Sequence, residues 1–202
     1  MKTGILFRLA ERDKIGGAMY FFLILLLAGF IFNWASAFTH FYSKLWGERA
    51  GKLASFILRN ILGIPVWVFG LVLATRASTT SLFNPSPMTE VLGWLLLVTG
   101  TIPMVWGLFF LRLRAYRPTE HDTLVSGGIF RYIRHPIYSG LLMDFVALIL
   151  LRHTNPALVA GILGWGFVLI QARLEEIDLV QRIPAYREYM QQVPRFFPRF
   201  WK

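Results

Sequence analysis

Long uninterrupted runs of apolar residues dominate the pattern of this chain. A transmembrane helix needs roughly 20 mostly apolar residues, and three runs reach that length, at residues 16–38, 54–75 and 90–111. Two shorter runs follow at residues 137–151 and 157–172. Because a backbone in lipid must satisfy its own hydrogen bonds, apolar runs of this kind favour helices. The pattern therefore predicts an all-α integral membrane protein with about five transmembrane helices.

The last two runs are separated only by the polar segment 152–156. So short a connection predicts that they form an antiparallel helical hairpin. We treat the chain as one structural domain with two parts, the three N-terminal spans at 1–111 and a C-terminal part at 112–202. The C-terminal part contains the hairpin and the residues with candidate chemistry.

The composition supports this class, since 55% of the residues are hydrophobic and 16% are charged, against about a quarter charged in soluble domains. The chain has no cysteine, which excludes disulfides, thiolate metal sites and cysteine nucleophiles, and we expect no metal. A net charge of +10 on a soluble protein would suggest nucleic acid. Here the basic residues lie between and after the apolar runs, so we expect membrane lipids as partners and no nucleic acid.

The basic residues also predict an orientation. With five spans, the first loop, the third loop at 112–135 and the tail share one side and carry 14 Lys and Arg residues, against six on the other side. Since cytoplasmic loops are enriched in Lys and Arg, this side is expected to face the cytoplasm, at the inner membrane in a bacterium. The basic segment Lys2–Lys14 opposes this orientation, and a short amphipathic helix on the membrane surface would account for it. The first run is longer than the apolar core of a signal peptide, so we interpret it as a retained helix.

The segment 124–140 has the features of a ligand site. Gly127 and Gly128 permit a sharp turn, and Pro136 suits the first position of a helix. Arg134 and His135 would then lie at a helix N-terminus, where an anion is favoured. The alternative is an interfacial anchor, in which these side chains only mark the level of the lipid headgroups.

A second cluster of charge follows the last apolar run. Glu175, Glu176 and Asp178 place three carboxylates within four positions, in a chain with only 11 acidic residues. They either attract a cationic ligand or form an intrahelical network with Arg173 and Arg182.

One more acidic residue, Asp144, lies inside the fourth run. It is either functional or a structural partner of Arg59 in the second run.

Taken in order, these elements resemble a known family. A Leu-Val pair, a Gly-containing turn, Arg-His-Pro-x-Tyr-x-Gly, an apolar hairpin, Glu-Glu, Tyr-x-x-Tyr and a final Pro-Arg-Phe-x-Pro are similar to the isoprenylcysteine carboxyl methyltransferase and phospholipid methyltransferase group. The resemblance covers about residues 112–200. It implies S-adenosylmethionine as cofactor, bound in a cytoplasmic pocket that the last helices and the C-terminal segment cover.

The resemblance implies a set of site residues. Arg134 is added to this set because it is expected at the helix N-terminus. The cofactor-binding candidates are His121, Leu124, Val125, Gly128, Phe130, Arg134, His135, Pro136, Tyr138, Glu175 and Glu176. The catalytic candidates are Glu175, Glu176 and Arg173. Three positions depart from the family. Asp122 stands where a His is common, with His121 beside it; Phe130 replaces a Tyr; and Ile183-Pro184 replaces a Phe-Gly turn.

The expected function is methyl transfer from S-adenosylmethionine to a lipophilic or small acceptor. An isoprenylcysteine carboxylate, a phospholipid amine and a thiol all remain open, as does the oligomeric state. Two other classes stay as alternatives, a membrane reductase using NADPH and a non-enzymatic membrane assembly factor or small transporter.

Overall fold

The computed structural model describes residues 21–77, 79, 81–112, 118–119 and 121–199. Within these residues the chain is α-helical, and its β-structure is limited to one isolated bridge between Ser81 and Thr154. The all-α membrane class predicted from the apolar runs is therefore confirmed. The basic N-terminal segment and the surface helix predicted there lie outside the described residues.

The first apolar run is helical over Phe21–Ala35 and then bends by 63° into α2 (Thr39–Trp46). The predicted span 16–38 therefore ends earlier than expected. Gly47, at φ 86°, reverses the chain into α3 (Glu48–Phe56), since glycine adopts this left-handed conformation at little cost. Much of the predicted first loop is thus helical.

The second run forms a single long helix, Glu48–Arg76, rather than the predicted 54–75. It comprises α3, a π-helical segment η1 (Ile57–Gly63) and α4 (Ile64–Arg76). Pro65 follows the π segment and has no N–H to offer the preceding turn, which disfavours regular α-helical bonding there. Single π turns of this kind are frequent at functional sites, and this one carries Arg59.

The C-terminal helices are α5 (Pro87–Leu111), α6 (Pro136–Arg152), α7 (Asn155–Arg182) and α8 (Tyr186–Gln192). The antiparallel hairpin of α6 and α7 is present, with Thr154 accepting a hydrogen bond from the backbone of Ala157. Its turn passes through His153 in the left-handed conformation. However, α7 continues ten residues beyond the predicted end at 172, so the acidic cluster lies on the helix itself.

Glycines allow close packing in this half of the molecule. A Cβ at Gly140 of α6 would lie 2.2 Å from the carbonyl oxygen of Gly100 of α5, so the two backbones nearly touch. In the hairpin, Gly161 and Gly164 lie against Ile149 and Phe145, as their spacing predicts. The N-terminal helices join α7 through a buried aromatic core, in which Phe30 stacks on Phe167 with ring centroids 4.3 Å apart.

Among the described residues, three helices are long and apolar enough to cross a membrane: Glu48–Arg76, Pro87–Leu111 and Asn155–Arg182. The bent pair of Phe21–Ala35 and α2 makes a fourth candidate. With 17 residues, α6 is shorter than the roughly 20 that a full span requires. The predicted count of five spans is therefore reduced to three or four on length and composition.

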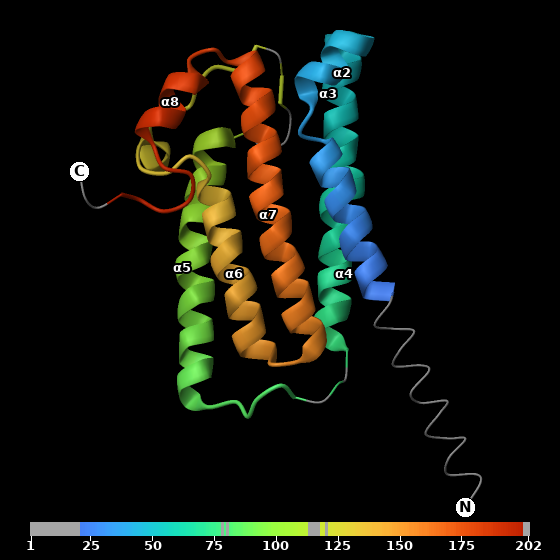
Figure 1. Ribbon diagram of the computed structural model, residues 1–202, viewed down its shortest axis with the longest axis vertical. Helices are drawn as coiled ribbons and strands as arrows, with labels where there is room; N and C mark the ends of the chain where they lie inside the picture. The colour runs from blue at the N-terminus through green and yellow to red at the C-terminus, as the bar shows by residue number, and fades with distance from the viewer. Residues whose placement is uncertain (1–20, 78, 80, 113–117, 120, 200–202) are drawn as a thin grey trace, which may run out of the picture.

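One end of the bundle gathers the polar segments. Figure 1 shows α2, α8, the C-terminal ends of α5 and α7 and the start of α6 at the same end. The loop between α4 and α5 and the turn between α6 and α7 lie at the opposite end. The two motifs singled out in the sequence therefore lie at one end of the molecule.

Candidate active site

The segment that leads into α6 is shaped by a turn and is hydrogen-bonded to the C-terminal tail, the segment that follows α8. Gly128 has a φ of 57° and lies so close to Phe110 that a Cβ would be 2.2 Å from its ring. The short 3₁₀ helix η3 (Gly128–Arg131) follows, and Pro136 begins α6. The backbone N–H groups of Arg134 and His135 donate to the carbonyl oxygens of Pro194 (2.9 Å) and Arg195 (3.0 Å). These two N–H groups are therefore occupied by the tail, which leaves the Arg134 guanidinium as the group available to an anion.

Glu176 is the centre of a buried charge cluster. Its side chain is 0% exposed and accepts two bonds from Arg195, at 3.0 Å from Nε and 2.6 Å from Nη2. His135 Nε2 lies 3.2 Å and Arg134 Nη2 3.4 Å from its Oε1. A carboxylate this deep is stable only when it is paired and hydrogen-bonded. Glu176 thus joins α7, the start of α6 and the tail.

Glu175, the preceding residue, belongs to a different network. Its Oε1 accepts from Arg59 Nη2 (2.8 Å), Tyr138 Oη (2.7 Å) and Gln171 Nε2 (3.0 Å). Of the two alternatives for Asp144, the structural pair with Arg59 is therefore wrong, because Arg59 pairs with Glu175 instead. Asp144 instead lies beside Gly100, and its Oδ1 is buried without a hydrogen-bond partner among the described residues.

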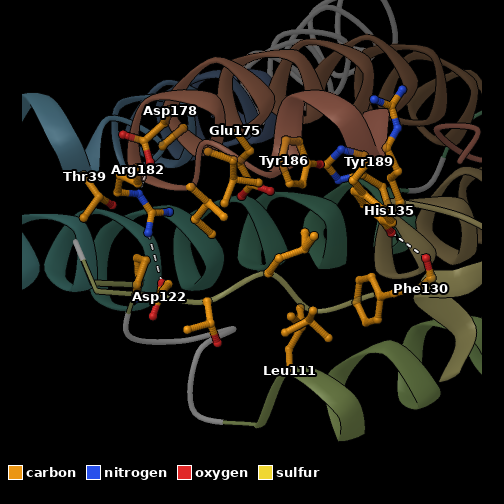
Figure 2. Close-up of a pocket in the computed structure, with 18 of the residues that line it drawn as sticks. Thr39, Leu111, Asp122, Phe130, His135, Glu175, Asp178, Arg182, Tyr186 and Tyr189 are labelled. Carbon is orange, nitrogen blue, oxygen red and sulfur yellow. Dashed lines mark hydrogen bonds and ion pairs between the residues drawn. The ribbon is translucent and has the colours of Figure 1, made fainter. Parts of the chain in front are cut away.

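A cavity of about 830 Å³, partly open to solvent, lies between α7, the N-terminal helices and the segment 118–130. Figure 2 shows its lining, with Glu175, Tyr186 and Tyr189 on one side and Leu111 and Phe130 on the other. Its polar end holds a chain of ion pairs, in which Arg182 contacts Asp178 (2.6 Å) and Asp122 (3.0 Å).

A second cavity of about 750 Å³ adjoins the first and is more apolar. Its apolar lining comprises Ile64, Trp67, Leu108, Leu111, Phe130, Pro136, Ile137, Leu141 and Phe167. Six residues line both cavities, namely Arg59, Leu111, Phe130, Arg134, His135 and Glu175. The charged cavity and the apolar cavity therefore meet at a shared wall.

The residue of that wall best placed to bind a ligand is Arg134. Its side chain is only 9% exposed, and Nε and Nη1 are buried with no hydrogen-bond partner in the part of the chain that the structure describes. A buried donor without a partner costs about 1–3 kcal/mol, more when it is charged. Native proteins rarely carry this cost without a function, so the site fits an anionic group at Arg134.

The structure brings most of the predicted site residues together. Leu124, Val125, Phe130, Arg134, His135 and Glu175 line the first cavity, and Pro136 and Tyr138 line the second. Gly128 shapes the turn, and Glu176 lies behind the wall in the buried cluster.

Besides Gly128 and Glu176, two further predicted residues lie outside both linings. His121 is 82% exposed and faces Glu48 at 3.4 Å, while its neighbour Asp122 lines the cavity. Arg173 is exposed on α7 and belongs to neither lining.

Several lining residues were not among the predicted site. Asp178 and Arg182 do form the predicted intrahelical pair, but they also build the polar end of the cavity. Arg59 had a sequence signal, since a charge inside an apolar run is costly and therefore marks function by default. Asn33 had none, because a single Asn near a helix end is common at the membrane interface.

Two tyrosines of α8 close the same cavity. Tyr189 Oη donates to the carbonyl oxygen of Phe130 at 2.5 Å. Burial raises the pKa of both the Tyr186 and Tyr189 hydroxyls above their ordinary value. Both therefore act as neutral side chains at physiological pH.

The fold and site define a class of protein: a helical membrane protein with a charged, solvent-open cavity at one end that adjoins an apolar cavity. Residues 88–186, about half of the chain, match the sequence pattern of the phospholipid methyltransferase family. That segment, which contains α5 to α7 and the loop with Arg134 and His135, carries the pattern of this family of membrane methyltransferases.

Three relatives extend this comparison. A cobalt-zinc-cadmium resistance protein of Cupriavidus metallidurans is 28% identical over 153 residues, which cover 73% of this chain and 68% of that protein. Protein-S-isoprenylcysteine O-methyltransferase B of Arabidopsis thaliana is 34% identical over 110 residues, or 54% of this chain and 55% of that protein. Methanethiol S-methyltransferase of a Pseudomonas species is 34% identical over 89 residues, or 41% of this chain and 32% of that protein.

The chain thus spans about half the length of the Arabidopsis relative and about a third of the Pseudomonas one. No solved structure matches the chain.

Proposed function

We propose that this protein transfers a methyl group from S-adenosylmethionine to a lipophilic or small acceptor, with its site at the cytoplasmic end of the bundle. The observation that carries this proposal is Arg134, a buried guanidinium with two unpartnered nitrogens at the wall between a charged and an apolar cavity. A two-part site of this kind suits a reaction between one polar and one apolar substrate.

The first cavity has groups that complement each part of the donor. Arg134 would pair with its carboxylate, since Arg–carboxylate bonds are charge-assisted and often bidentate. Glu175 and Asp178 are placed to meet its ammonium or ribose, and the apolar side chains of Leu124, Val125 and Leu179 would pack on its adenine. When bound, the donor supplies an activated methyl group on a sulfonium.

The role of the protein is then to position the substrates. Methyl transfer from a sulfonium is a direct displacement, so holding donor and acceptor in line provides much of the rate gain. The buried Glu176 cluster contributes by fixing Arg134 and His135 against the tail. The apolar second cavity would hold the acceptor, and its position between helices would let a lipid-like molecule enter from the membrane.

The names of the relatives leave three acceptor chemistries in view: a prenylcysteine carboxylate, a thiol and, from the family, a phospholipid amine. The test is methyl transfer from labelled S-adenosylmethionine by the purified full chain in lipid nanodiscs, with one acceptor of each class. We expect saturable transfer to at least one acceptor and donor binding by calorimetry.

The site assignment is tested with His135→Ala and Glu176→Gln, compared with Arg187→Gln on the exposed face of α8. Donor affinity should fall roughly tenfold or more in His135→Ala and Glu176→Gln. His135 is part of the cavity wall that contains Arg134, and Glu176 contacts that wall from behind. The control should match the wild-type protein. A wild-type protein that binds no donor would refute the function, and full donor affinity in both variants would refute the site.

A further inference from the structure

The N-terminal helices contribute two buried polar atoms to the apolar cavity. Asn33 on the helix Phe21–Ala35 is 5% exposed, and Trp67 on α4 is 8% exposed. Both residues line this cavity, and neither lines the charged one. Among the described residues, neither Asn33 Oδ1 nor Trp67 Nε1 has a hydrogen-bond partner. Because a buried polar atom without a partner is costly, the two atoms mark a position that a ligand or a water completes.

The two side chains belong to neighbouring turns of helices in direct contact. A Cβ on Gly29, one turn before Asn33, would lie 2.4 Å from the backbone nitrogen of Trp67. A Cβ on Gly63, one turn before Trp67, would lie 2.6 Å from Asn33 Oδ1. The two helices therefore run antiparallel here, and Asn33 and Trp67 are about 6 Å apart along them, at 1.5 Å per residue. This separation suits one small polar group.

Packing fixes both side chains at the cavity. The indole ring of Trp67 is tilted against the rings of Phe30 and Phe167, with centroids 6.2 Å and 6.0 Å away. The amide of Asn33 lies against Gly63, where any added side chain would displace it. Neither polar atom is free to turn to a partner elsewhere in the protein.

The charged groups of the apolar cavity already have counter-ions. Arg59 is paired with Glu175 at 2.8 Å. Arg134 and His135 lie 3.4 Å and 3.2 Å from Glu176. Arg134 lines both cavities, and its remaining nitrogens are assigned above to the donor. The two unpartnered atoms that belong to the apolar cavity alone are therefore uncharged.

These two atoms call for a ligand group of one kind. An indole N–H only donates and an amide oxygen only accepts, so the group must accept one hydrogen bond and donate another. A hydroxyl or a secondary amide does both and is neutral. A carboxylate has no hydrogen to donate to Asn33, and an ammonium has no lone pair to accept from Trp67. Each would leave one buried atom unmatched among apolar walls, which is costly.

We infer that the methyl acceptor is an apolar molecule with a hydroxyl or a secondary amide set away from its reacting end, and that Asn33 and Trp67 bind this group. The reacting end would lie at the wall shared with the donor cavity, which neither residue lines. Both residues lie outside the family match at 88–186, so they would select the acceptor of this chain. The assignment to the acceptor rests on the function proposed above, whereas binding of the polar group does not.

The first test observes the Trp67 N–H directly and needs no donor. The full chain in nanodiscs, labelled with ¹⁵N-tryptophan, gives one indole resonance for each of its seven Trp residues. Trp67→Phe identifies the resonance of Trp67. Dodecanol and N-methyldodecanamide should move it downfield, whereas tridecane, of similar length without a polar group, should not. The probe with the lower half-saturating concentration identifies the group.

Other tryptophans provide controls in the same spectrum. Trp34 and Trp165 each donate from Nε1 to a backbone carbonyl oxygen, at 3.2 Å and 2.9 Å, so their resonances should not move downfield. Trp94 on α5 is 59% exposed and reports on the surrounding lipid. Equal shifts at Trp67 and Trp94 would mean that the probe only altered the bilayer, and would overturn the inference.

A variant of the other residue tests the acceptor. Asn33→Leu keeps a similar volume and removes the oxygen, so the half-saturating concentration of dodecanol should rise roughly tenfold. In methyl transfer the same variant should raise KM for the acceptor roughly tenfold and leave the donor dissociation constant within about threefold. Asn84→Leu, in the exposed loop before α5, is the matched control and should behave as wild type.

The outcomes separate the two claims. A Trp67 resonance that no probe moves, as for a site that holds only water, overturns the inference, as does unchanged dodecanol binding in Asn33→Leu. If Asn33→Leu does not fold, the wild-type spectra still decide. Dodecanol should also compete with the acceptor, and binding without competition overturns the acceptor assignment. A protein that binds dodecanol but no donor keeps the polar subsite and loses the proposed function, whereas one that methylates an acceptor with an unmoved Trp67 resonance keeps the function and loses the subsite.

Discussion

At the scale of single residues, two adjacent glutamates have different roles. Successive residues on a helix point about 100° apart, so Glu175 faces the shared cavity wall while Glu176 faces the tail. Glu175 is bonded to Arg59 from the N-terminal half, and Glu176 to Arg134, His135 and Arg195 from the C-terminal half. The acidic pair thus connects both halves of the chain to α7.

Removing the charge of Glu176 should destabilise the protein. In Glu176→Gln the buried Arg134 loses its counter-ion, and breaking a buried pair in this way typically costs about 3–5 kcal/mol. We expect a clear fall in melting temperature in detergent, measured by scanning fluorimetry. Glu188→Gln, on the exposed face of α8, should change little. Equal melting temperatures for the two variants would show that the buried cluster does not stabilise the fold.

At the scale of elements, close contact between α5 and α6 positions the site. These helices touch at Gly100 and Gly140, where a Cβ on either glycine would come within 3.0 Å of the opposite backbone. Arg134 and His135 directly precede Pro136, the first residue of α6, so the separation of the two helices affects the width of the shared wall. The same packing places Asp144 beside Gly100, away from the site.

Gly140→Ala should therefore push α6 away from α5. The added methyl would meet Gly100 O at 2.2 Å, and overpacking of this kind usually costs about 1–3 kcal/mol. Gly166→Ala is the matched control, because nothing lies within 4 Å of its Cβ position on α7. It should be neutral or slightly stabilising, since Ala is the better helix former. Thermal unfolding of both variants measures the difference, and a Gly140→Ala protein as stable as the control would contradict the close contact.

At the scale of the whole molecule, the C-terminal tail completes the site. Pro194 and Arg195 accept the N–H groups of Arg134 and His135, and Ser139 Oγ donates to the carbonyl oxygen of Phe196 at 2.6 Å. These contacts join residues about 60 positions apart in the sequence.

Removing the tail after Gln192 should open the cavity but leave the helices in place. The truncated chain loses both backbone bonds and the Arg195–Glu176 pair, so Arg134 is no longer held in the wall. We expect donor affinity to fall roughly tenfold or more, measured by calorimetry, with the helical signal in circular dichroism retained. Full donor affinity in the truncated chain would show that the tail does not contribute to the site.

The orientation of the whole molecule is also testable. The chain has no cysteine, so single introduced cysteines report their own accessibility. Asn84→Cys lies in the exposed loop at the end opposite the site, and Arg187→Cys lies on α8 at the site end. With the site in the cytoplasm, a membrane-impermeant maleimide should label only Asn84→Cys in intact cells and both variants after lysis. The reverse labelling would mean that the site faces outward.

Local pattern was sufficient for much of the fold. The apolar runs predicted the helices, and the turn at 152–156 predicted the hairpin. Helix ends were less predictable: α7 continues through charged residues, because these find partners in the folded protein that the sequence does not reveal. The π turn at Ile57–Gly63 had no local signal beyond Pro65, since it depends on packing against neighbouring helices.

The candidate site was predicted in part, for a similar reason. Arg134, His135 and Glu175 were found because they lie in short motifs of unusual residues. The alternative that paired Asp144 with Arg59 was wrong, because two charges in separate apolar runs do not reveal which helix faces which. The sequence left open whether His121 or Asp122 takes the position of the family's His, and in the structure it is Asp122 that contacts Arg182.

The sequence alone determined that this chain is a helical membrane protein, and it predicted candidate chemistry in two C-terminal motifs, because hydrophobic periodicity and residue type are local properties. Only the tertiary structure decided how those motifs are used. It placed Glu175 in the cavity wall and Glu176 in the buried charge cluster that binds the tail. It also brought Arg59 from the second helix to the candidate site. Such pairings depend on contacts between residues more than 100 positions apart in the sequence, which no local pattern specifies.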